Sequence, residues 1–476
     1  MKNVVLVYPP FSPGNKQKYG LPPLGILYAA TVLKEKGINA VAIDAEILGL
    51  SIPDMVDRIF KHKPDLVGVS VMTPILPTTL KLIKKIKERD STVKTLIGGA
   101  HINSTFEETF QFTNDLDFII YGEGEHALVE LTNSLDNKEK YNEIKGLIYR
   151  DNDGKIIKNP SREFLSDLDT LPFPDHDLLD VDVHEYFTPY VDKKPVTAMM
   201  TSRGCPYLCT YCDAHTTFGR QVRNRSAKNI VDEIEFLKNK YHYTHIVFKD
   251  STFTLDRQRT IDICNAIIDR KIDINWTCNT RLDRVDPEML SLMKKAGCKS
   301  ISPGVESGSD EILKIIKKAI TKEQITKGFK MIHDAGIETT AYFMIGNQGE
   351  TKETAMETID FAVRLNPTFA SFFIAIAYPG TELYRWAVEN KKVDPNWYKD
   401  ASVKHAESFL INPIPAGQLK LDFDSEEIKK LAFKKFYFRP GYIFKTMKTI
   451  IRKPYYIKHI VNSLPFLVKW SIFNKG

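Results

Sequence analysis

Short apolar runs alternate with longer helical patterns along most of the chain, and this alternation limits the possible folds more than any other feature. In the first 135 residues the runs are NVVLVY, AVAID, LVGVSV, TLIGG and DFIIYG, separated by helical patterns such as LGILYAATVLKEKG. Strands that are apolar on both faces and alternate with helices form a parallel sheet with helices on both sides. We therefore expect an α/β Rossmann-like domain at residues 1–135, with its ligand at the carboxyl ends of the strands.

The same alternation returns on a larger scale between residues 191 and 400. Six expected strands are VTAMMTS, HIVFKD, INWTCNT, SISPGVE, TTAYFMIG and ASFFIAIA, and helices follow five of them. Six such units predict a partial β/α barrel of the TIM type, whose chemistry gathers where the strands end. Residues 136–190 are rich in Pro, Asp and Asn, which predicts a linker with one small hairpin.

Residues 401–476 are expected to form a small, basic, aromatic-rich helical domain. From Lys429 onward there are ten Lys, two Arg and no Asp or Glu, so the rest of the +6 chain is mildly acidic. Two interpretations stay open. The segment could meet an anionic membrane surface, or its helices could close the active site and keep a solvated basic face. Nucleic acid is the less favoured partner.

Two further features concern the compartment. No run of 18 apolar residues occurs, so we expect nothing that spans a membrane. The six cysteines form no disulfide framework, which favours a reducing cytosol. We expect a cytoplasmic protein. Peripheral contact with the inner face of the membrane, through the basic tail, stays open.

The stretch RGCPYLCTYC places three cysteines, Cys205, Cys209 and Cys212, in one short segment. Three thiolates suit one iron–sulfur cubane, because a single loop can wrap three of its corners. A zinc ribbon would need a second close pair of ligands, and none follows. One iron then keeps an open position that amino and carboxylate groups can chelate. The isolated residues Cys264, Cys278 and Cys298 are expected to be buried thiols rather than a second cluster.

RGCPYLCTYC resembles the CxxxCxxC signature of radical S-adenosylmethionine enzymes, and the resemblance covers about residues 195–400. It implies that the three cysteines ligate one [4Fe-4S] cluster whose open iron binds S-adenosylmethionine. It also implies contacts with that cofactor from GVESG, where Glu306 can accept hydrogen bonds, and from MIGNQGET, whose glycines admit an adenine. The residues assigned to the S-adenosylmethionine site are Gly304, Glu306, Ser307, Gly346, Gly349, Asp250, Thr280 and Arg281.

The N-terminal segments PPLGILYAATVLKEKG, PDLVGVSVMT, LIGGAH and FIIYGEGE resemble the cobalamin-binding domain fused to many radical S-adenosylmethionine proteins. The resemblance implies cofactor contacts from Asp44, Glu46, Gly49, Ser70, Gly98 and Gly99. Classical corrinoid domains carry D-x-H-x-x-G, whereas DAEILG has Glu46 in place of the histidine. We therefore expect no protein imidazole below cobalt, with Glu46 at the corrin edge or in solvent. His101 is expected to be a hydrogen-bonding loop residue.

The combined resemblance implies a cobalamin-dependent radical S-adenosylmethionine methyltransferase. In this family a 5′-deoxyadenosyl radical takes hydrogen from an unactivated carbon, which then receives methyl from methylcobalamin. Residues 1–204 contain no cysteine, which argues against a methylthiotransferase. An oxidative cyclase or rearranging enzyme of the porphyrin-cyclase type is the enzymatic alternative, and a non-catalytic corrinoid or iron–sulfur sensor is a third. The expected partners are a small-molecule or lipid-like substrate and an electron donor such as flavodoxin or ferredoxin.

Overall fold

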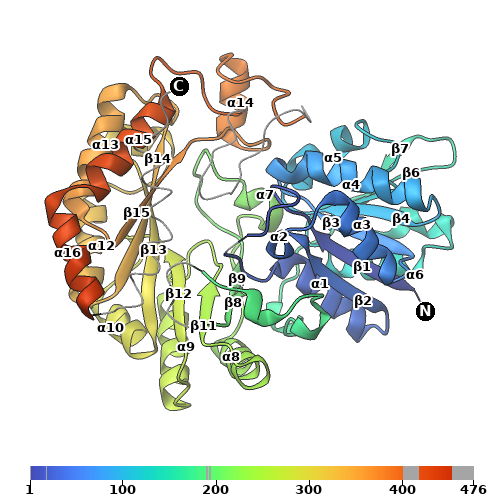
Figure 1. Cartoon of the computed structure of the whole chain (residues 1–476), viewed down its shortest axis with the longest axis horizontal. Coiled ribbons are helices and arrows are strands. Elements are labelled where there is room, and N and C mark those ends of the chain that lie inside the picture. Colours follow the sequence, from blue (N-terminus) through green and yellow to red (C-terminus); the bar gives the residue numbers. More distant parts are fainter. Residues whose placement is uncertain (1, 18, 189–190, 192–193, 400–416, 453–476) are drawn as a thin grey trace.

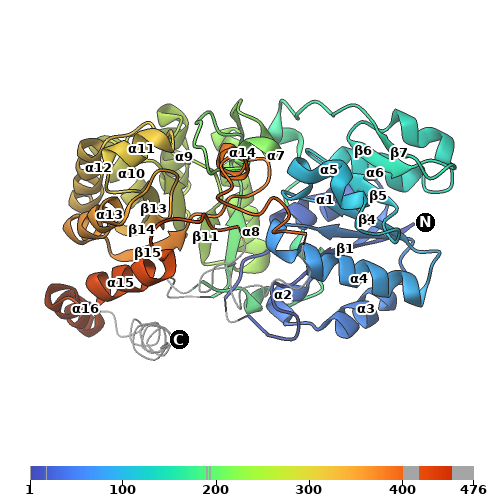
Figure 2. The ribbon, with the colours of Figure 1, turned by 90° about the horizontal axis from the view of Figure 1, so that it is seen from above.

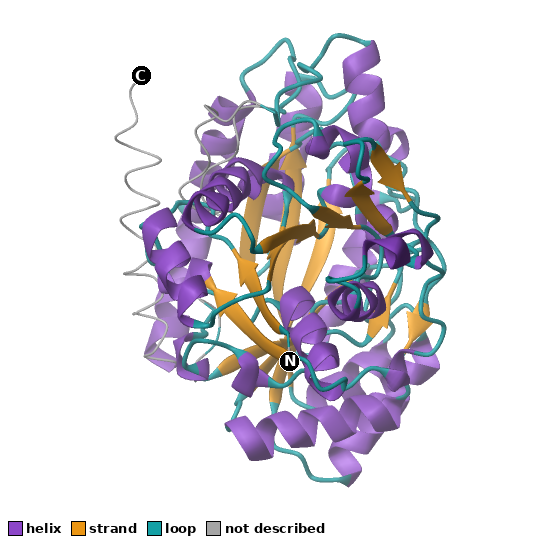
Figure 3. Ribbon diagram, turned by 90° about the vertical axis from the view of Figure 1, so that its right-hand side faces the viewer, coloured by secondary structure: helices purple, strands orange, loops and turns teal. Residues whose placement is uncertain are grey.

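Two α/β halves lie side by side in the molecule, each built around its own sheet (Figures 1 and 2). The computed structural model describes residues 2–17, 19–188, 191, 194–399 and 417–452. Strands form the interior of each half and helices cover them (Figure 3). The mixed α/β class predicted from the alternating pattern is confirmed.

The N-terminal sheet has seven strands in the order β2-β1-β3-β4-β5-β6-β7. They are β1 (Asn3–Tyr8), β2 (Asn39–Asp44), β3 (Leu66–Ser70), β4 (Lys94–Gly98), β5 (Phe118–Ile120), β6 (Leu147–Arg150) and β7 (Ile156–Lys158). The first five are parallel, whereas β6 and β7 pair antiparallel. The hairpin expected between residues 136 and 190 is therefore present, and it extends this sheet.

Helices cover both faces of this sheet because its strands are apolar on both sides. Val5 and Val7 of β1 join the apolar cluster under α3, α4 and α5, whereas Val4 and Leu6 join the cluster under α1 and α6. The helices are α1 (Leu24–Glu35), α2 (Ala45–Leu48), α3 (Ile52–Lys61), α4 (Leu76–Arg89), α5 (Ile102–Phe110) and α6 (Glu125–Asn133). Short 3-10 turns are η1 (Thr73–Ile75), η2 (Lys138–Glu143), η3 (Leu168–Thr170), η4 (His176–Leu178) and η5 (Val183–Glu185).

The second sheet has six parallel strands in the order β15-β14-β13-β12-β11-β8, so each β/α unit lies beside the next. The strands are β8 (Val196–Met199), β11 (His245–Phe248), β12 (Asn275–Thr280), β13 (Cys298–Glu306), β14 (Glu338–Ile345) and β15 (Phe369–Ile374). Their helices are α8 (Ala227–Tyr241), α9 (Arg257–Asp269), α10 (Pro287–Lys295), α11 (Asp310–Ile315), α12 (Lys322–Asp334), α13 (Lys352–Leu365) and α14 (Glu382–Glu389). The two short strands β9 (Ser202–Arg203) and β10 (Arg223–Asn224) pair separately, around helix α7 (Ala214–Phe218).

The basic tail supplies two of the described helices, α15 (Ser425–Tyr437) and α16 (Pro440–Arg452). Helix α15 packs on α13 and β15, and its Ile428, Ala432 and Phe436 join the apolar core of the second sheet. This part of the tail therefore continues the outer helical layer of that half. Residues 400–416 and 453–476, which the tail prediction also covers, lie outside the described residues. Within the described ranges no helix is both long and apolar enough to cross a membrane.

Candidate functional site

The three motif cysteines lie on the loop between β9 and α7. Gly204, which precedes the first of them, has φ +95°, and a Cβ there would come within 2.2 Å of the Gln221 carbonyl oxygen. A glycine is therefore required for the loop to turn at this point. The Cys205 amide donates to the Gly219 carbonyl at 3.2 Å, which closes the loop on itself. The loop carries Cys205, Cys209 and Cys212, each half-buried.

The three thiols lie on one short loop, which suits the corners of a single iron–sulfur cluster. A cubane takes one thiolate at each of three corners, so its ligands need not meet at a point. Burial raises the pKa of Cys212 to about 11, and the nearby charges of Asp213, Cys209 and Cys205 add to this rise. The thiols are thus close enough to influence one another, and a cationic metal centre would favour their ionised form.

A carboxylate, an ammonium and a phenol meet beside Cys209. The Glu306 Oε1 atom accepts a hydrogen bond from Lys318 Nζ at 2.9 Å, and the same Nζ lies 3.3 Å from the Tyr211 hydroxyl. Glu306 ends β13, Tyr211 belongs to the cysteine loop, and Lys318 follows α11. The side chains of Glu306 and Lys318 are 13% and 9% exposed, so their charges compensate each other in a nearly buried place.

The backbone around Glu306 is irregular. Glu306 has φ +67°, and the pairing of β13 with β14 shifts register between Gly304 and Glu306. Non-glycine residues in this left-handed region are uncommon and cluster at functional sites. A Cβ on Gly304 would lie 2.3 Å from Glu306 Oε1 and 2.9 Å from Lys318 Nζ. Gly304 therefore leaves the space into which the Glu306 side chain folds back.

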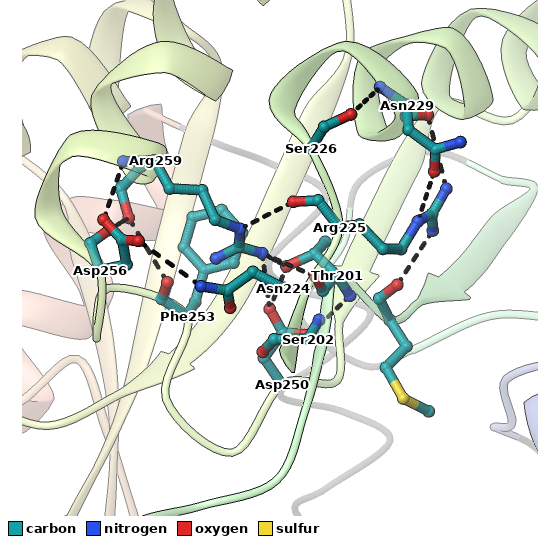
Figure 4. A network of polar contacts seen from close by, with 12 residues as sticks. Thr201, Ser202, Asn224, Arg225, Ser226, Asn229, Asp250, Phe253, Asp256 and Arg259 are labelled. Carbon is teal, nitrogen blue, oxygen red and sulfur yellow. Dashed lines mark hydrogen bonds and ion pairs between the residues drawn. The ribbon is translucent and has the colours of Figure 1, made fainter. Parts of the chain in front are cut away.

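Asp250 binds the backbone of Thr201 and Ser202, just before the cysteine loop (Figure 4). Its Oδ1 atom accepts the amides of Thr201 at 2.7 Å and Ser202 at 3.1 Å, and the Thr201 hydroxyl binds Oδ2. Arg259 lies 3.8 Å from Oδ2 and donates to the Thr201 carbonyl at 2.9 Å. Asp250 is 1% exposed. Its carboxylate is thus engaged with the chain itself, and its assigned contact with the cofactor stays a prediction.

Arg281 joins the cysteine loop to the segment that carries Lys318. Its guanidinium lies 3.8 Å from the centroid of the Tyr207 ring and donates to the carbonyls of Lys318 at 2.7 Å and Ala319 at 3.0 Å. Thr280, one residue earlier at the end of β12, bonds to the Thr254 hydroxyl. Arg281 therefore lies at the predicted site, where it holds two loops together.

The glycines and the serine assigned to S-adenosylmethionine have local structural reasons of their own. Gly346 and Gly349 have φ +84° and +75°, and a Cβ on them would meet Ser425 and Ile315 at 2.9 and 2.8 Å. The Ser307 hydroxyl is fully buried and contacts the Thr358 hydroxyl at 3.2 Å. These residues shape the ends of β13 and β14, and their contacts with the cofactor stay predictions.

A cavity of about 180 Å³ lies at the carboxyl edge of the N-terminal sheet. The predicted residues Ser70, Gly98 and Gly99 line it at the ends of β3 and β4. A Cβ on Gly99 would come within 2.9 Å of the Val71 backbone, so the strand end can keep its shape only with glycine there. Most of the remaining wall is apolar, with Leu6, Ile26, Leu96, Ile120 and Leu128. A mostly apolar wall with a few polar groups is typical of small-molecule sites.

Charged residues connect this cavity to the cysteine loop. Arg203, two residues before Cys205, forms ion pairs with Glu123 at 3.0 Å and Glu125 at 2.6 Å. Arg223 pairs with the same Glu123 at 2.8 Å. Arg203, Glu123 and Glu125 also line the cavity, together with Thr217 and Phe218 of α7. The two elements that flank the cysteine loop, β9 and α7, therefore form one wall of the cavity in the N-terminal half.

The DAEILG segment forms the one-turn helix α2. Asp44 is 3% exposed. Its buried carboxylate caps this helix and accepts a hydrogen bond from the Tyr186 hydroxyl at 3.0 Å. Glu46 accepts the Phe11 amide at 2.7 Å, and burial raises its pKa to about 7. Gly49 ends the helix with φ +65°, against the Lys16 backbone. The Glu46 carboxylate thus binds the loop before α1, and its expected place at the corrin edge or in solvent stays a prediction. The cofactor contacts assigned to Asp44, Glu46 and Gly49 stay predictions.

His101 is a hydrogen-bonding loop residue, as expected. Its Nδ1 lies 3.0 Å from the Thr73 hydroxyl, and the side chain packs edge-on against Tyr398. The residue is 2% exposed, and burial lowers its pKa to about 3. The three isolated cysteines lie in the apolar core of the second sheet, where burial raises the pKa of Cys264 and of Cys278.

Several residues at the site were not singled out from the sequence: Tyr211, Lys318, Arg203, Glu123 and Glu125. Tyr211 and Arg203 lie within the quoted cysteine stretch, and the two glutamates lie in GEGE, which follows β5. Two charged residues in a loop at the end of a strand could have indicated that these glutamates belong to a binding site. Lys318 stands in a lysine-rich turn, where no pattern separates a buried lysine from exposed ones.

Comparisons with known proteins agree with this arrangement. Residues 199–362 match the family model of the radical SAM superfamily, and residues 14–132 match that of the B12 binding domain. An uncharacterized methyltransferase of Pyrococcus horikoshii is 33% identical over 448 residues, which cover 93% of this chain and 94% of that protein. The anaerobic magnesium-protoporphyrin IX monomethyl ester cyclase of Rubrivivax gelatinosus is 29% identical over 389 residues, or 80% of this chain and 69% of the cyclase.

A solved structure shares the fold of both halves. The cobalamin-dependent S-adenosylmethionine radical enzyme OxsB, solved with aqua-cobalamin and S-adenosylmethionine bound, superposes with a TM-score of 0.70 at 19% identity. The match covers 97% of this chain and 72% of that one.

Proposed function

The chain belongs to the radical S-adenosylmethionine superfamily and carries a B12-binding domain, and from this premise we propose that it is a methyltransferase. The acceptor would be an unactivated carbon of a small-molecule or lipid-like substrate. The enzyme uses one [4Fe-4S] cluster, S-adenosylmethionine and cobalamin as cofactors. When bound, the cluster supplies the electron that cleaves S-adenosylmethionine to a 5′-deoxyadenosyl radical, and cobalamin supplies the methyl group.

The residues of the second half are suited to hold the first two groups. Cys205, Cys209 and Cys212 would ligate the cluster. Glu306, fixed by Lys318 2.9 Å away, would accept hydrogen bonds from the amino group or ribose of S-adenosylmethionine. The glycine turns after β14 would let an adenine approach the backbone.

The residues of the N-terminal half are suited to hold part of cobalamin. The cavity of about 180 Å³ is far smaller than the whole cofactor. We assign it to the nucleotide tail, because its apolar wall and the bare backbone at Gly98 and Gly99 accept a flat base. The corrin ring would then lie outside the cavity, towards the second half.

One observation carries the proposal: β9 and α7, the two elements that flank the cysteine loop, line the cavity at the edge of the N-terminal sheet. Arg203 lines that cavity, pairs with Glu123 and Glu125, and precedes Cys205 by two residues. The two proposed cofactor sites would therefore adjoin, as a reaction that uses both on one substrate requires. The name of the Pyrococcus horikoshii relative supports methyl transfer as the outcome.

The test uses the full chain, reconstituted anaerobically with iron, sulfide and cobalamin and supplied with a reductant such as flavodoxin. S-adenosylmethionine with an isotope-labelled methyl group is added to small-molecule and lipid extracts. We expect release of 5′-deoxyadenosine and a new product that carries the label. Replacing any one of the three motif cysteines by Ala should abolish both, because two thiolates do not hold the cubane.

The cyclase of Rubrivivax gelatinosus supports a second candidate function, oxidative ring closure without methyl transfer. The same experiment separates the two, because a cyclase product is two hydrogens lighter than its substrate and carries no label. Detection of such a product, with 5′-deoxyadenosine but no labelled product, would replace the methyltransferase proposal.

A further inference from the structure

The exposed apolar side chains of the described residues gather at one place, helix α16 and the turn before it. Seven large apolar side chains in the described part of the chain are exposed, and five of them lie between residues 438 and 451. The most exposed are Ile451 at 79%, Phe444 at 72% and Met447 at 58%, with Ile443 at 44% and Phe438 at 40%. Scattered exposed apolar residues are normal on a protein surface, but a cluster of this kind marks an interaction site.

These side chains share one face of the helix. Residues 444, 447 and 451 are spaced by three and four, and residue 443 lies beside them, so they form a single stripe. The opposite side of α16 is anchored to the protein. Tyr442 is 9% exposed and donates to the Thr368 carbonyl at 3.0 Å, and Arg439 donates to the Val363 carbonyl at 3.0 Å. The helix is therefore held in place while its apolar stripe faces outward.

The position of α16 separates this stripe from the cofactor site. Both ribbon views place α16 at the edge of the molecule that lies farthest from the N-terminal sheet (Figures 1 and 2). The strand β9 that leads into the cysteine loop lies at the boundary between the two halves, because its Arg203 pairs with glutamates of the N-terminal half. The stripe therefore has no part in binding the cofactors.

Charge distinguishes the kinds of partner that could cover the stripe. The sequence from Lys429 to the end contains ten Lys, two Arg and no Asp or Glu. Lys434 and Lys448 are exposed on α15 and α16. A second copy that paired through the same face would bring like charges together, which opposes association. A surface with negatively charged groups above an apolar layer can bind both the lysines and the apolar stripe of this segment.

We propose that α16 binds the surface of a membrane that contains anionic lipid. The apolar stripe enters the boundary between headgroups and acyl chains, and the lysines of α15 and α16 contact the lipid phosphates. Helix α16 lies flat in the interface, since it is too short and too charged to cross the bilayer. This inference goes beyond the proposed reaction and does not depend on it.

The experiment measures sedimentation of the full chain with lipid vesicles at low salt. Vesicles of equal parts phosphatidylcholine and phosphatidylglycerol are compared with pure phosphatidylcholine vesicles. We expect binding to the anionic vesicles, weak binding to the neutral ones, and release at high salt, where the Debye length shrinks to ~3 Å. Absence of binding to the anionic vesicles at low salt would overturn the proposal.

Two pairs of variants test the stripe and the charges separately. The triple variant Phe444→Ser/Met447→Ser/Ile451→Ser should bind at least ~10-fold more weakly, whereas Phe444→Leu/Met447→Leu/Ile451→Leu should bind like the parent chain. Lys434→Gln/Lys448→Gln should lose about fivefold for each lysine. Its control, Lys228→Gln/Lys330→Gln, removes two exposed charges from α8 and α12 and should bind normally.

Other outcomes contradict the proposal in identifiable ways. Unchanged vesicle binding by the serine variant would show that another part of the chain binds the lipid. A dimer of the parent chain that the serine variant abolishes would show that the stripe is an interface between copies. None of these measurements requires cofactor or substrate, so their failure differs from failure of the methyltransferase proposal.

Discussion

The charged residues at the end of β13 depend on one another at the level of single side chains. Glu306 sits in a strained backbone conformation, and its carboxylate is balanced by Lys318 in a nearly buried place. The loss of either partner leaves an uncompensated charge away from water, which costs more than the pair contributes when it is intact. The position of Glu306 beside the cysteine loop therefore depends on Lys318.

Replacing Lys318 by Met should destabilise the protein by about 3 kcal/mol, because Glu306 is left buried without its cation. The double variant Lys318→Met/Glu306→Gln should recover most of this loss, since neither charge remains. Denaturant unfolding of the two single variants and the double variant gives the coupling energy. Additive losses, with no recovery in the double variant, would show that the two side chains do not depend on each other.

Glu350, in the turn after β14, makes the stability of the protein depend on pH. Its carboxylate accepts the Asn347 amide at 3.0 Å, and burial raises its pKa from 4.5 to about 7. Between these two pH values the folded protein binds the proton more tightly than the unfolded chain, so this group makes stability fall as pH rises from 4.5 to 7. The penalty at pH 8 is on the order of 3 kcal/mol.

The variant Glu350→Gln keeps the acceptor oxygen and removes the charge. It should be more stable than the parent chain at pH 8, and the difference should disappear below about pH 4.5, where Glu350 is protonated in both states. Thermal unfolding of both proteins across this range measures the difference. A constant difference at all pH values would show that Glu350 does not titrate as its burial requires.

At the scale of elements, the cysteine loop is held by the ends of neighbouring strands. Asp250, just beyond β11, binds the amides of Thr201 and Ser202 at the start of the loop (Figure 4). Arg281, just beyond β12, stacks on Tyr207 within the loop. The geometry of the three thiols therefore depends on strands that carry no cysteine ligand.

The variant Asp250→Ala should lower iron incorporation several-fold although all three cysteines remain. Two buried amides lose their acceptor and Arg259 loses its ion-pair partner, so the base of the loop is no longer defined. Asp250→Asn, which keeps one oxygen for the amides, should have a smaller effect. Iron and sulfide content after anaerobic reconstitution provides the measurement, with Asp232→Ala on the surface of α8 as the control. Full iron content in Asp250→Ala would show that the loop needs no such support.

At the scale of the whole molecule, the two halves share an apolar core. One cluster of buried side chains includes Val5, Val69 and Ile97 of the N-terminal sheet and Ala375, Leu383 and Trp397 of the second half. The ion pairs of Arg203 cross the same boundary. A cofactor bound between the halves therefore meets two surfaces whose relative position is already defined.

We expect the two halves to unfold together in one calorimetric transition, because separating them exposes this shared core. Trp397→Ala should lower the midpoint of that single transition, since it removes a side chain that is 5% exposed. Two resolved transitions in the parent chain would show that each half is stable alone. The matched comparison is Trp386→Ala on α14, whose side chain is less completely buried.

The sequence by itself determined the elements and the cysteine loop. All eleven strands expected before residue 378 are present, because apolar runs and helical periods are patterns over a few neighbouring residues. The spacing of Cys205, Cys209 and Cys212 is likewise a local property. Ser70, Gly98 and Gly99, which the resemblance assigned to the cofactor, line one cavity because parallel strands end at one edge.

Only the tertiary structure decided which polar residues meet. Lys318 pairs with Glu306, and Arg203 with Glu123, across chain separations that no local pattern relates. The tail divides in the same way: Phe436 and Tyr442 pack on the second half, whereas Phe444 and Ile451 remain exposed. Composition alone does not tell which of these aromatic and aliphatic residues are buried and which are exposed. Their fates differ because the path of the backbone turns one side of α16 toward the protein and the other away from it.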